Sequence, residues 1–177
     1  MELEKLKYPI GHFKSPEHIN LDTVKKWIQE IEELPSQLSA VVANLSEAQL
    51  DTPYRDGGWT VRQIVHHIGD SHLNSYVRLK LALTEKQPTI KPYDQALWAE
   101  LPDYTLFPVK DSLTFIELLH RRWVILLKSL DQDQLDLTFL HPESGIIILK
   151  KNIGLYAWHG RHHLAQIKAL IQRKHWR

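Results

Sequence analysis

Cysteine is absent from this 177-residue chain. Its absence excludes disulfide bridges, thiolate metal ligands and a cysteine nucleophile, and it suits a reducing compartment. A surplus of one charge is also absent, because 22 lysines and arginines are matched by 21 aspartates and glutamates, for a formal net charge of +1. Nucleic-acid-binding domains usually carry a strong basic surplus. We therefore expect no nucleic-acid partner.

Long hydrophobic runs are absent as well. No stretch approaches the roughly 20 apolar residues of a membrane-spanning helix, and the first residues, MELEKLKYPIGHF, lack the charged and then apolar plan of a secretory signal. What is present is an ordinary globular composition, with 43% hydrophobic and 24% charged residues. These features predict a cytoplasmic protein without a membrane partner, folded as a single domain over residues 1–177.

Apolar residues recur with helical spacing in the first half of the chain. They follow Asn20, a suitable N-cap, and Pro35 should kink the helix that they form. Thr60 and Gln63 match the capping box that begins many helices. The periodic residues after them predict a second long helix over about residues 60–84.

The second half of the chain predicts two more helices. Four prolines exclude a long helix over residues 85–111, which we predict to be a crossover with one short helix over residues 94–101. Asp111 is expected to cap a third helix and Asn152 a fourth, with the segment FLHPESGIIILK forming a β-hairpin between them. This pattern predicts an all-α protein: an up-down four-helix bundle with a long crossover and a small hairpin before the last helix.

Six of the 11 histidines lie in two short clusters. These are His66, His67 and His72 in the second helix, and His159, His162 and His163 in the fourth. The i, i+4 spacing of His159 and His163 puts both imidazoles on one helical face, and His67 continues the buried face of its own helix. His66 and His162 point about 100° away from those faces. We expect these two to lie on the surface.

Three inward imidazoles from facing helices can bind one divalent metal. Because Gly160, Arg161 and His162 separate the pair, the glutamate of the HExxH motif is missing and a zincin is excluded. Three neutral histidines leave a coordination position open for water or substrate, as catalytic sites do. Zn²⁺ is the first choice of metal and Ni²⁺ the second, since imidazole suits both.

The alternative is that the three are hydrogen-bonded core or surface histidines without a metal. Burying three imidazoles without partners is costly, however, and one cation satisfies all three. Asp70, one turn after His67, could orient a ligand imidazole or accept a proton from metal-bound water. Gln166 could hold a ligand or that water, and it could equally just cap a polar pocket. His72 and His120 stay open, although a buried, hydrogen-bonded histidine is commoner than a fourth ligand.

Four segments resemble the DinB-like superfamily, and within it the YfiT group of metal-dependent hydrolases. These are YPIG at 8–11, DTPYRDGGWTVRQIVHHIGDSHLNSYVRLKL at 51–81, KPYD at 91–94 and GLYAWHGRHHLAQI at 154–167. The resemblance implies a cytoplasmic homodimer of four-helix bundles, each holding one divalent metal through three histidines. The ligand patterns of the family fall on His67, His159 and His163.

Three functions follow from such a site, each with a small-molecule ligand. The first is a metal-dependent hydrolase, in which the metal lowers the pKa of a bound water toward about 7 and Asp70 is the candidate base. The second is a metal-dependent S-transferase that adds a low-molecular-weight thiol, such as bacillithiol, to electrophiles, which needs no protein base. The third is a non-catalytic metal-binding stress protein, for which one site in 177 residues is an inefficient store.

Overall fold

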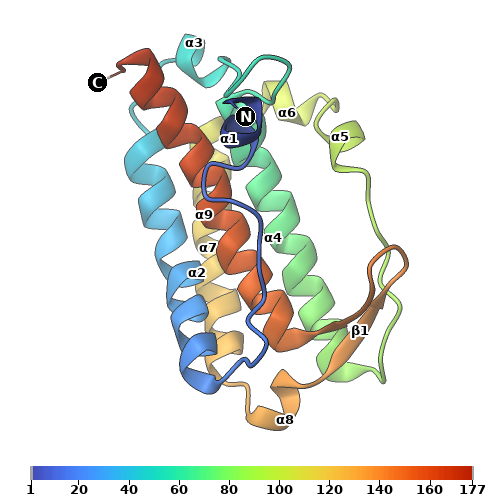
Figure 1. Ribbon diagram of the computed structural model, residues 1–177. Helices are drawn as coiled ribbons and strands as arrows, with labels where there is room; N and C mark the ends of the chain where they lie inside the picture. Colours follow the sequence, from blue (N-terminus) through green and yellow to red (C-terminus); the bar gives the residue numbers. More distant parts are fainter. Residues whose placement is uncertain (1, 177) are drawn as a thin grey trace.

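The computed structural model describes residues 2–176 and contains four long helices with short elements between them (Figure 1). The long helices are α2 (Leu21–Val42), α4 (Val61–Thr84), α7 (Val109–Lys128) and α9 (Leu149–Lys174). The short ones are α1 (Glu2–Lys7), α3 (Glu47–Leu50), α5 (Gln95–Trp98), α6 (Asp103–Leu106) and α8 (Gln132–Leu135). The strands β1 (Thr138–His141) and β2 (Gly145–Ile148) form an antiparallel hairpin. The predicted four-helix bundle, crossover and hairpin are confirmed.

The helices pack in a ring, in which α2 contacts α7 and α9, and α4 contacts the same two helices. Their directions do not alternate, which corrects the up-down expectation. His66 and His72 of α4 lie beside Ser112 and His120 of α7, so these two helices run parallel. The physical reason is the crossover over residues 85–108, which returns the chain to the end of the bundle where α4 begins (Figure 1).

Two of the four long helices begin at the predicted caps, and the other two begin without a side-chain cap. Asn20 caps α2, and the capping box of Thr60 and Gln63 begins α4. Neither Asp111 nor Asn152 is a cap, however. Helix α7 begins two residues before Asp111, directly after Pro108, and α9 follows β2 without a side-chain cap. Proline suits a helix start because its missing N–H would have no partner there.

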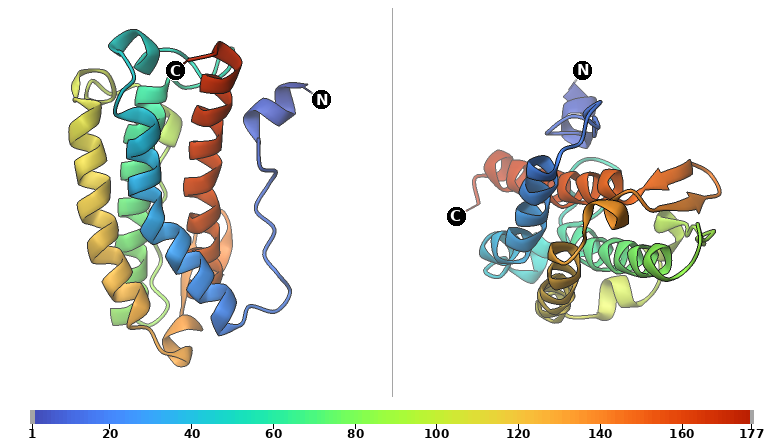
Figure 2. Two further views of the ribbon diagram at one scale, coloured as in Figure 1. Left: turned by 90° about the vertical axis from the view of Figure 1, so that its left-hand side faces the viewer. Right: turned by 90° about the horizontal axis from the view of Figure 1, so that it is seen from below.

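Two apolar clusters fill the bundle. One joins the first half of α2 to the last turns of α4 and the first half of α9, and the other joins the second half of α2 to the first turns of α4 and the second half of α9. Helix α2 continues through Pro35, and the left view of Figure 2 shows its axis changing direction, as predicted. A layer of histidines lies between the two clusters. No helix within residues 2–176 combines the length and apolar character that crossing a lipid bilayer requires.

Candidate metal centre

The structure brings His67 of α4 together with His159 and His163 of α9. One ring nitrogen from each lies within 4.8 Å of the others. The Nε2 atoms of His67 and His159 are 3.1 Å apart, and the ring centroids of His159 and His163 are 4.5 Å apart. Over residues 2–176, this is the one group of three or more such side chains close enough to share an ion.

The donor set fits a divalent metal. Nitrogens bound tetrahedrally to Zn²⁺ at about 2.0–2.1 Å stand roughly 3.3 Å from each other, close to the separation of the two Nε2 atoms. On the opposite side of the rings, the Nδ1 of His159 lies 3.0 Å from His72 Nε2 and the Nδ1 of His163 lies 2.9 Å from Gln166 Oε1. With their Nδ1 atoms held in this way, both rings turn their Nε2 atoms toward the shared centre, where His159 Nε2 meets His67 Nε2.

Burial keeps these imidazoles neutral, which is the form that binds metals. Desolvation lowers the pKa of His67 to about 4. Desolvation, followed by the neighbouring imidazoles, lowers the pKa of His159 and His163 well below the ordinary value. The lone pairs are thus available to a cation at neutral pH.

Gln166 is hydrogen-bonded to His163, one of the three clustered imidazoles. Its amide nitrogen donates to the Lys7 carbonyl at 2.8 Å, which fixes the carbonyl end of the amide toward His163. The same nitrogen lies 3.1 Å from His162 Nε2. The N-terminal segment thereby supports the metal centre from the outside.

His66 and His162 are buried, which corrects the expectation that they lie on the surface. His66 Nδ1 is 2.7 Å from the Ser112 hydroxyl on α7. His162 stacks on Trp158 at a ring-centroid distance of 4.6 Å. His66 is buried because α4 contacts both α7 and α9, so its buried arc is wider than the single stripe on which the expectation rested. His162 is buried because the N-terminal segment packs on α9, with the Tyr8 ring centroid 5.5 Å from that of His162.

Asp70 does not orient a ligand imidazole. Its carboxylate accepts a 2.7 Å hydrogen bond from the Tyr104 hydroxyl, and burial raises its pKa. The Nδ1 of His67 faces away from the cluster and is the nitrogen that Asp70 could have held, yet it is buried without a hydrogen-bond partner within residues 2–176. The role of proton acceptor is the one that stays open to Asp70.

Two clefts reach the ligands. One of about 570 Å³ opens on His159 and is lined by Tyr93 and Arg78 among others, and a second of about 330 Å³ opens on His163 and Trp59. Burial raises the pKa of Tyr93 to about 12, so its phenol remains a hydrogen-bond donor at neutral pH. Sequence reasoning missed Tyr93 because it lies in the crossover, where no periodicity marks a buried face.

His72 and His120 lie outside the three-histidine group and extend the hydrogen bonding of His159. His72 Nδ1 lies 2.9 Å from His120 Nε2, and His120 Nδ1 lies 2.7 Å from the carbonyl oxygen of Ile31. Both rings are almost fully buried. The interpretation of His120 as a buried, hydrogen-bonded histidine is confirmed.

Comparisons with known proteins agree with this site. The sequence pattern of the DinB superfamily matches residues 30–167. A protein of Oceanobacillus iheyensis is 56% identical over 170 residues, which cover 96% of this chain and 98% of that protein. A protein of Bacillus mycoides is 57% identical over 174 residues, which cover 98% and 100%. Both bear the name "Putative metal-dependent hydrolase".

Solved structures show the same fold. YfiT from Bacillus subtilis superposes with a TM-score of 0.95 and 48% identity, over 98% of this chain and 99% of that one. It is described as "a probable metal-dependent hydrolase with an unusual four-helix bundle topology". The four-helix bundle protein TT2238, at a TM-score of 0.58 and 19% identity, shares the fold alone.

Proposed function

This chain belongs to the DinB superfamily, and from that premise we propose that it is a metal-dependent hydrolase with one divalent metal held by His67, His159 and His163. One observation carries the proposal. Within residues 2–176, the three imidazoles have no fourth protein ligand, and clefts open on two of them. A three-histidine site of this kind leaves a position for water or substrate, whereas structural sites are closed by four protein ligands.

A bound divalent metal supplies a water of lowered pKa and polarises a substrate carbonyl. The side chains around the cleft supply the other parts. On the wall of the cleft that opens on His159, Tyr93 offers a hydroxyl donor for a substrate and Arg78 offers positive charge. Asp70 directly precedes Ser71, which lines the same cleft. Tyr104 occupies one carboxylate oxygen of Asp70, and the other is the proposed proton acceptor.

Zn²⁺ is the metal we propose, with Ni²⁺ as the competitor, at one ion per chain. Imidazole nitrogens bind both ions, and no thiolate is present to narrow the choice. Metal analysis of protein purified without an affinity resin tests the assignment, and equimolar Zn²⁺ is the supporting result. A metal content below one tenth of the protein concentration after incubation with either ion would contradict it.

Hydrolysis is tested with a panel of esters, lactones and amides. The metal-loaded protein should hydrolyse at least one of them, and chelation should abolish the activity until metal is restored. His163→Ala provides the inactive control. Turnover that persists in fully chelated protein would contradict the proposal.

A thiol S-transferase is the second candidate, and a specific observation favours it. Within residues 2–176, no carboxylate joins the group formed by His67, His159 and His163, and Asp70 is already bound by Tyr104, so a reaction that needs no protein base suits the site. The absence of cysteine also leaves no protein thiol to compete with a thiol substrate for the metal. Metal-dependent conjugation of bacillithiol to a fluorogenic electrophile, without hydrolysis of the ester panel, would favour this candidate over the first.

We also propose a cytoplasmic homodimer. Helix α7 carries apolar side chains on its outer face, with Leu118 56% and Ile125 73% exposed, and such residues in a contiguous patch mark interaction surfaces. Light scattering coupled to gel filtration should give twice the 20.7 kDa mass of the chain. A mass equal to that of one chain at micromolar concentration would contradict the dimer.

A further inference from the structure

Pro35 changes the hydrogen bonding inside α2. Proline has no backbone N–H, so the carbonyl four residues earlier in the helix, that of Ile31, loses its helical donor. The Nδ1 atom of His120 on α7 lies 2.7 Å from this carbonyl oxygen, in the interior of the bundle. A carbonyl oxygen can only accept, so the proton of the His120 ring is on Nδ1.

The position of the proton on His120 fixes the donor and the acceptor in two further hydrogen bonds between histidine rings. With its proton on Nδ1, the neutral His120 accepts at Nε2 from the Nδ1–H of His72, 2.9 Å away. The Nε2 of His72 in turn accepts from the Nδ1–H of His159 at 3.0 Å. His159 is therefore left with a lone pair on Nε2, the atom that lies 3.1 Å from His67 Nε2 in the metal centre.

We propose that His72 and His120 are positioning residues that, anchored on the carbonyl freed by Pro35, hold His159 in the tautomer that presents Nε2 to the metal. The inference rests on the proposed metal site. All four long helices take part, because α2 supplies Ile31, α7 His120, α4 His72 and α9 His159. Histidine ligands in general depend on such outer partners for their tautomer and orientation.

His163 is held by the same principle through a different set of groups. The Lys7 carbonyl accepts from the Gln166 amide, and the amide oxygen accepts from His163 Nδ1. In both cases a backbone carbonyl, which can only accept, ends the series and fixes the direction of every hydrogen bond in it. Two of the three ligands thus have their tautomers set before any metal binds.

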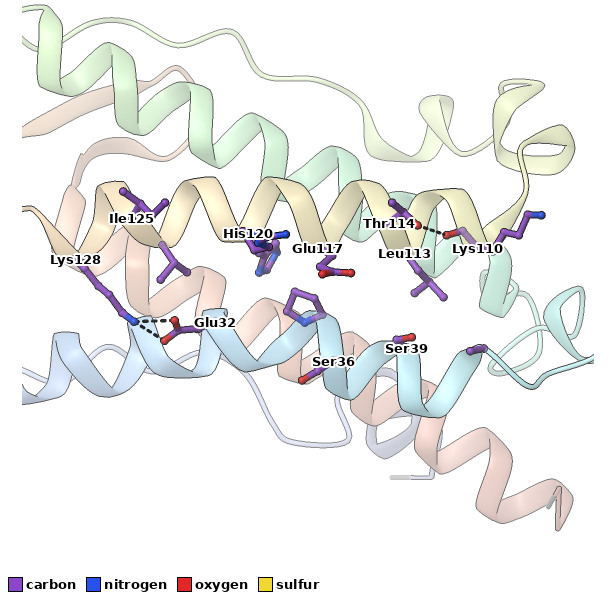
Figure 3. Close-up of a pocket in the computed structure, with 14 residues that line it drawn as sticks. Glu32, Ser36, Ser39, Lys110, Leu113, Thr114, Glu117, His120, Ile125 and Lys128 are labelled. Atoms are coloured by element: carbon purple, nitrogen blue, oxygen red, sulfur yellow. Dashed lines mark hydrogen bonds and ion pairs between the residues drawn. The ribbon is translucent and has the colours of Figure 1, made fainter.

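We call the hydrogen-bonded series from the Ile31 carbonyl through His120 and His72 to His159 the relay. Its end at His120 lies beside a groove of about 800 Å³ between α2 and α7, which Pro35 and His120 both line. Figure 3 shows His120 on α7 at this groove, with Glu117 on one side of it along the helix and Ile125 on the other. A side chain of altered shape at position 120 can extend toward this space. We therefore expect substitutions at position 120 to be better tolerated than at His72, which is 0% exposed.

The first test needs no metal. Nitrogen NMR of the apo protein, labelled at the histidine rings, distinguishes a protonated from an unprotonated ring nitrogen. His72, His120 and His159 are all expected to carry the proton on Nδ1. A proton on Nε2 of His159 in the folded apo protein would overturn the proposal, whatever the protein catalyses.

The second test measures metal affinity by competition with a chromophoric chelator. His72→Leu and His120→Leu should each weaken Zn²⁺ binding by about 10- to 100-fold, the usual loss when an outer partner of a ligand is removed. His72→Gln should recover most of this loss, since its amide oxygen can accept from His159 Nδ1. Wild-type affinity in folded His120→Leu would overturn the proposal.

His66→Leu is the matched control. His66 is buried and hydrogen-bonded to Ser112, but it is outside the relay. The His66→Leu variant should lose stability but keep its affinity for Zn²⁺. If it loses as much affinity as His72→Leu and His120→Leu, then removing any buried imidazole has this effect and the assignment is overturned. If the wild type binds no metal, the proposed function fails while the NMR test still decides the tautomers.

Discussion

Acidification should destabilise the metal-free protein steeply, because its interior holds a layer of neutral histidines. Desolvation lowers the pKa of four of them to about 4 and that of three more well below the ordinary 6.5. The unfolded chain takes up protons at these groups near pH 6.5, whereas the folded chain does not. The free energy of unfolding is therefore highest above pH 6.5 and decreases as the pH falls toward 4.

The size of the effect follows from His120, which is 1% exposed and is not a ligand. Each pKa unit corresponds to about 1.4 kcal/mol, so keeping one such imidazole neutral costs about 2 kcal/mol at pH 5. Three such groups cost about 6 kcal/mol, which is comparable with the lower end of the roughly 5–15 kcal/mol by which domains are stable. We therefore expect the metal-free protein to lose most of its stability between pH 6.5 and 5.

Urea unfolding of chelator-treated protein, followed by circular dichroism between pH 8 and 5, measures this loss. His120→Gln should flatten the pH dependence by about 1 kcal/mol per pH unit, because it removes one of the groups that titrate. His18→Gln, the same substitution at an exposed position, is the control. An unfolding free energy that stays constant from pH 7.5 to 5 would refute the reasoning.

Three further predictions concern the metal and the packing of the bundle. His163→Ala should lose stoichiometric metal by elemental analysis, whereas His162→Ala should keep it, because only the former belongs to the three-histidine group. Removing metal that was present at about 1,000 times its Kd should lower the unfolding free energy by roughly 4 kcal/mol, and an unchanged melting temperature after chelation would speak against the site. Gly154→Ala should cost about 1–3 kcal/mol in urea unfolding, because its new methyl group would stand 2.7 Å from the Trp27 ring; stability equal to that of the wild type would show that Trp27 can move aside.

Local pattern was enough to predict the helices and the metal cluster. Helical spacing of apolar residues located all four long helices, and the i, i+4 pair of His159 and His163 needs only helix geometry to share a face. His67 could be assigned to the same cluster because the apolar residues of its helix form one buried stripe, and His67 lies on that stripe. The structure brings all three together as that reasoning required.

Features that depend on which helices are neighbours could not be predicted in this way. Burial of His66 requires α7 beside α4, and the partner of Asp70 is Tyr104, which comes from the crossover. The hydrogen bond of His72 to His120 joins two helices that are far apart in sequence. Nothing in either helix alone indicates that these positions meet.

The direction of α7 decides whether the relay to the metal exists. His72 lies about halfway along α4 and His120 about halfway along α7, and the pairs His66–Ser112 and His72–His120 keep the same order along both helices. In a bundle with α7 reversed, these two pairs could not form together. The relay and the buried position of His66 therefore both depend on the parallel arrangement of α4 and α7.

The crossover makes this arrangement possible and shapes the site at the same time. Helix α4 has 24 residues and is about 36 Å long, a distance that an extended chain covers in about 11 residues. Residues 85–108 exceed this requirement, and the surplus forms α5, α6 and the wall of the cleft that carries Tyr93. A shortened crossover that still spans α4 but lacks residues 92–98 should consequently keep the fold and the metal while losing the cleft. Metal binding with activity unchanged in that variant would place the substrate elsewhere, in the cleft on His163.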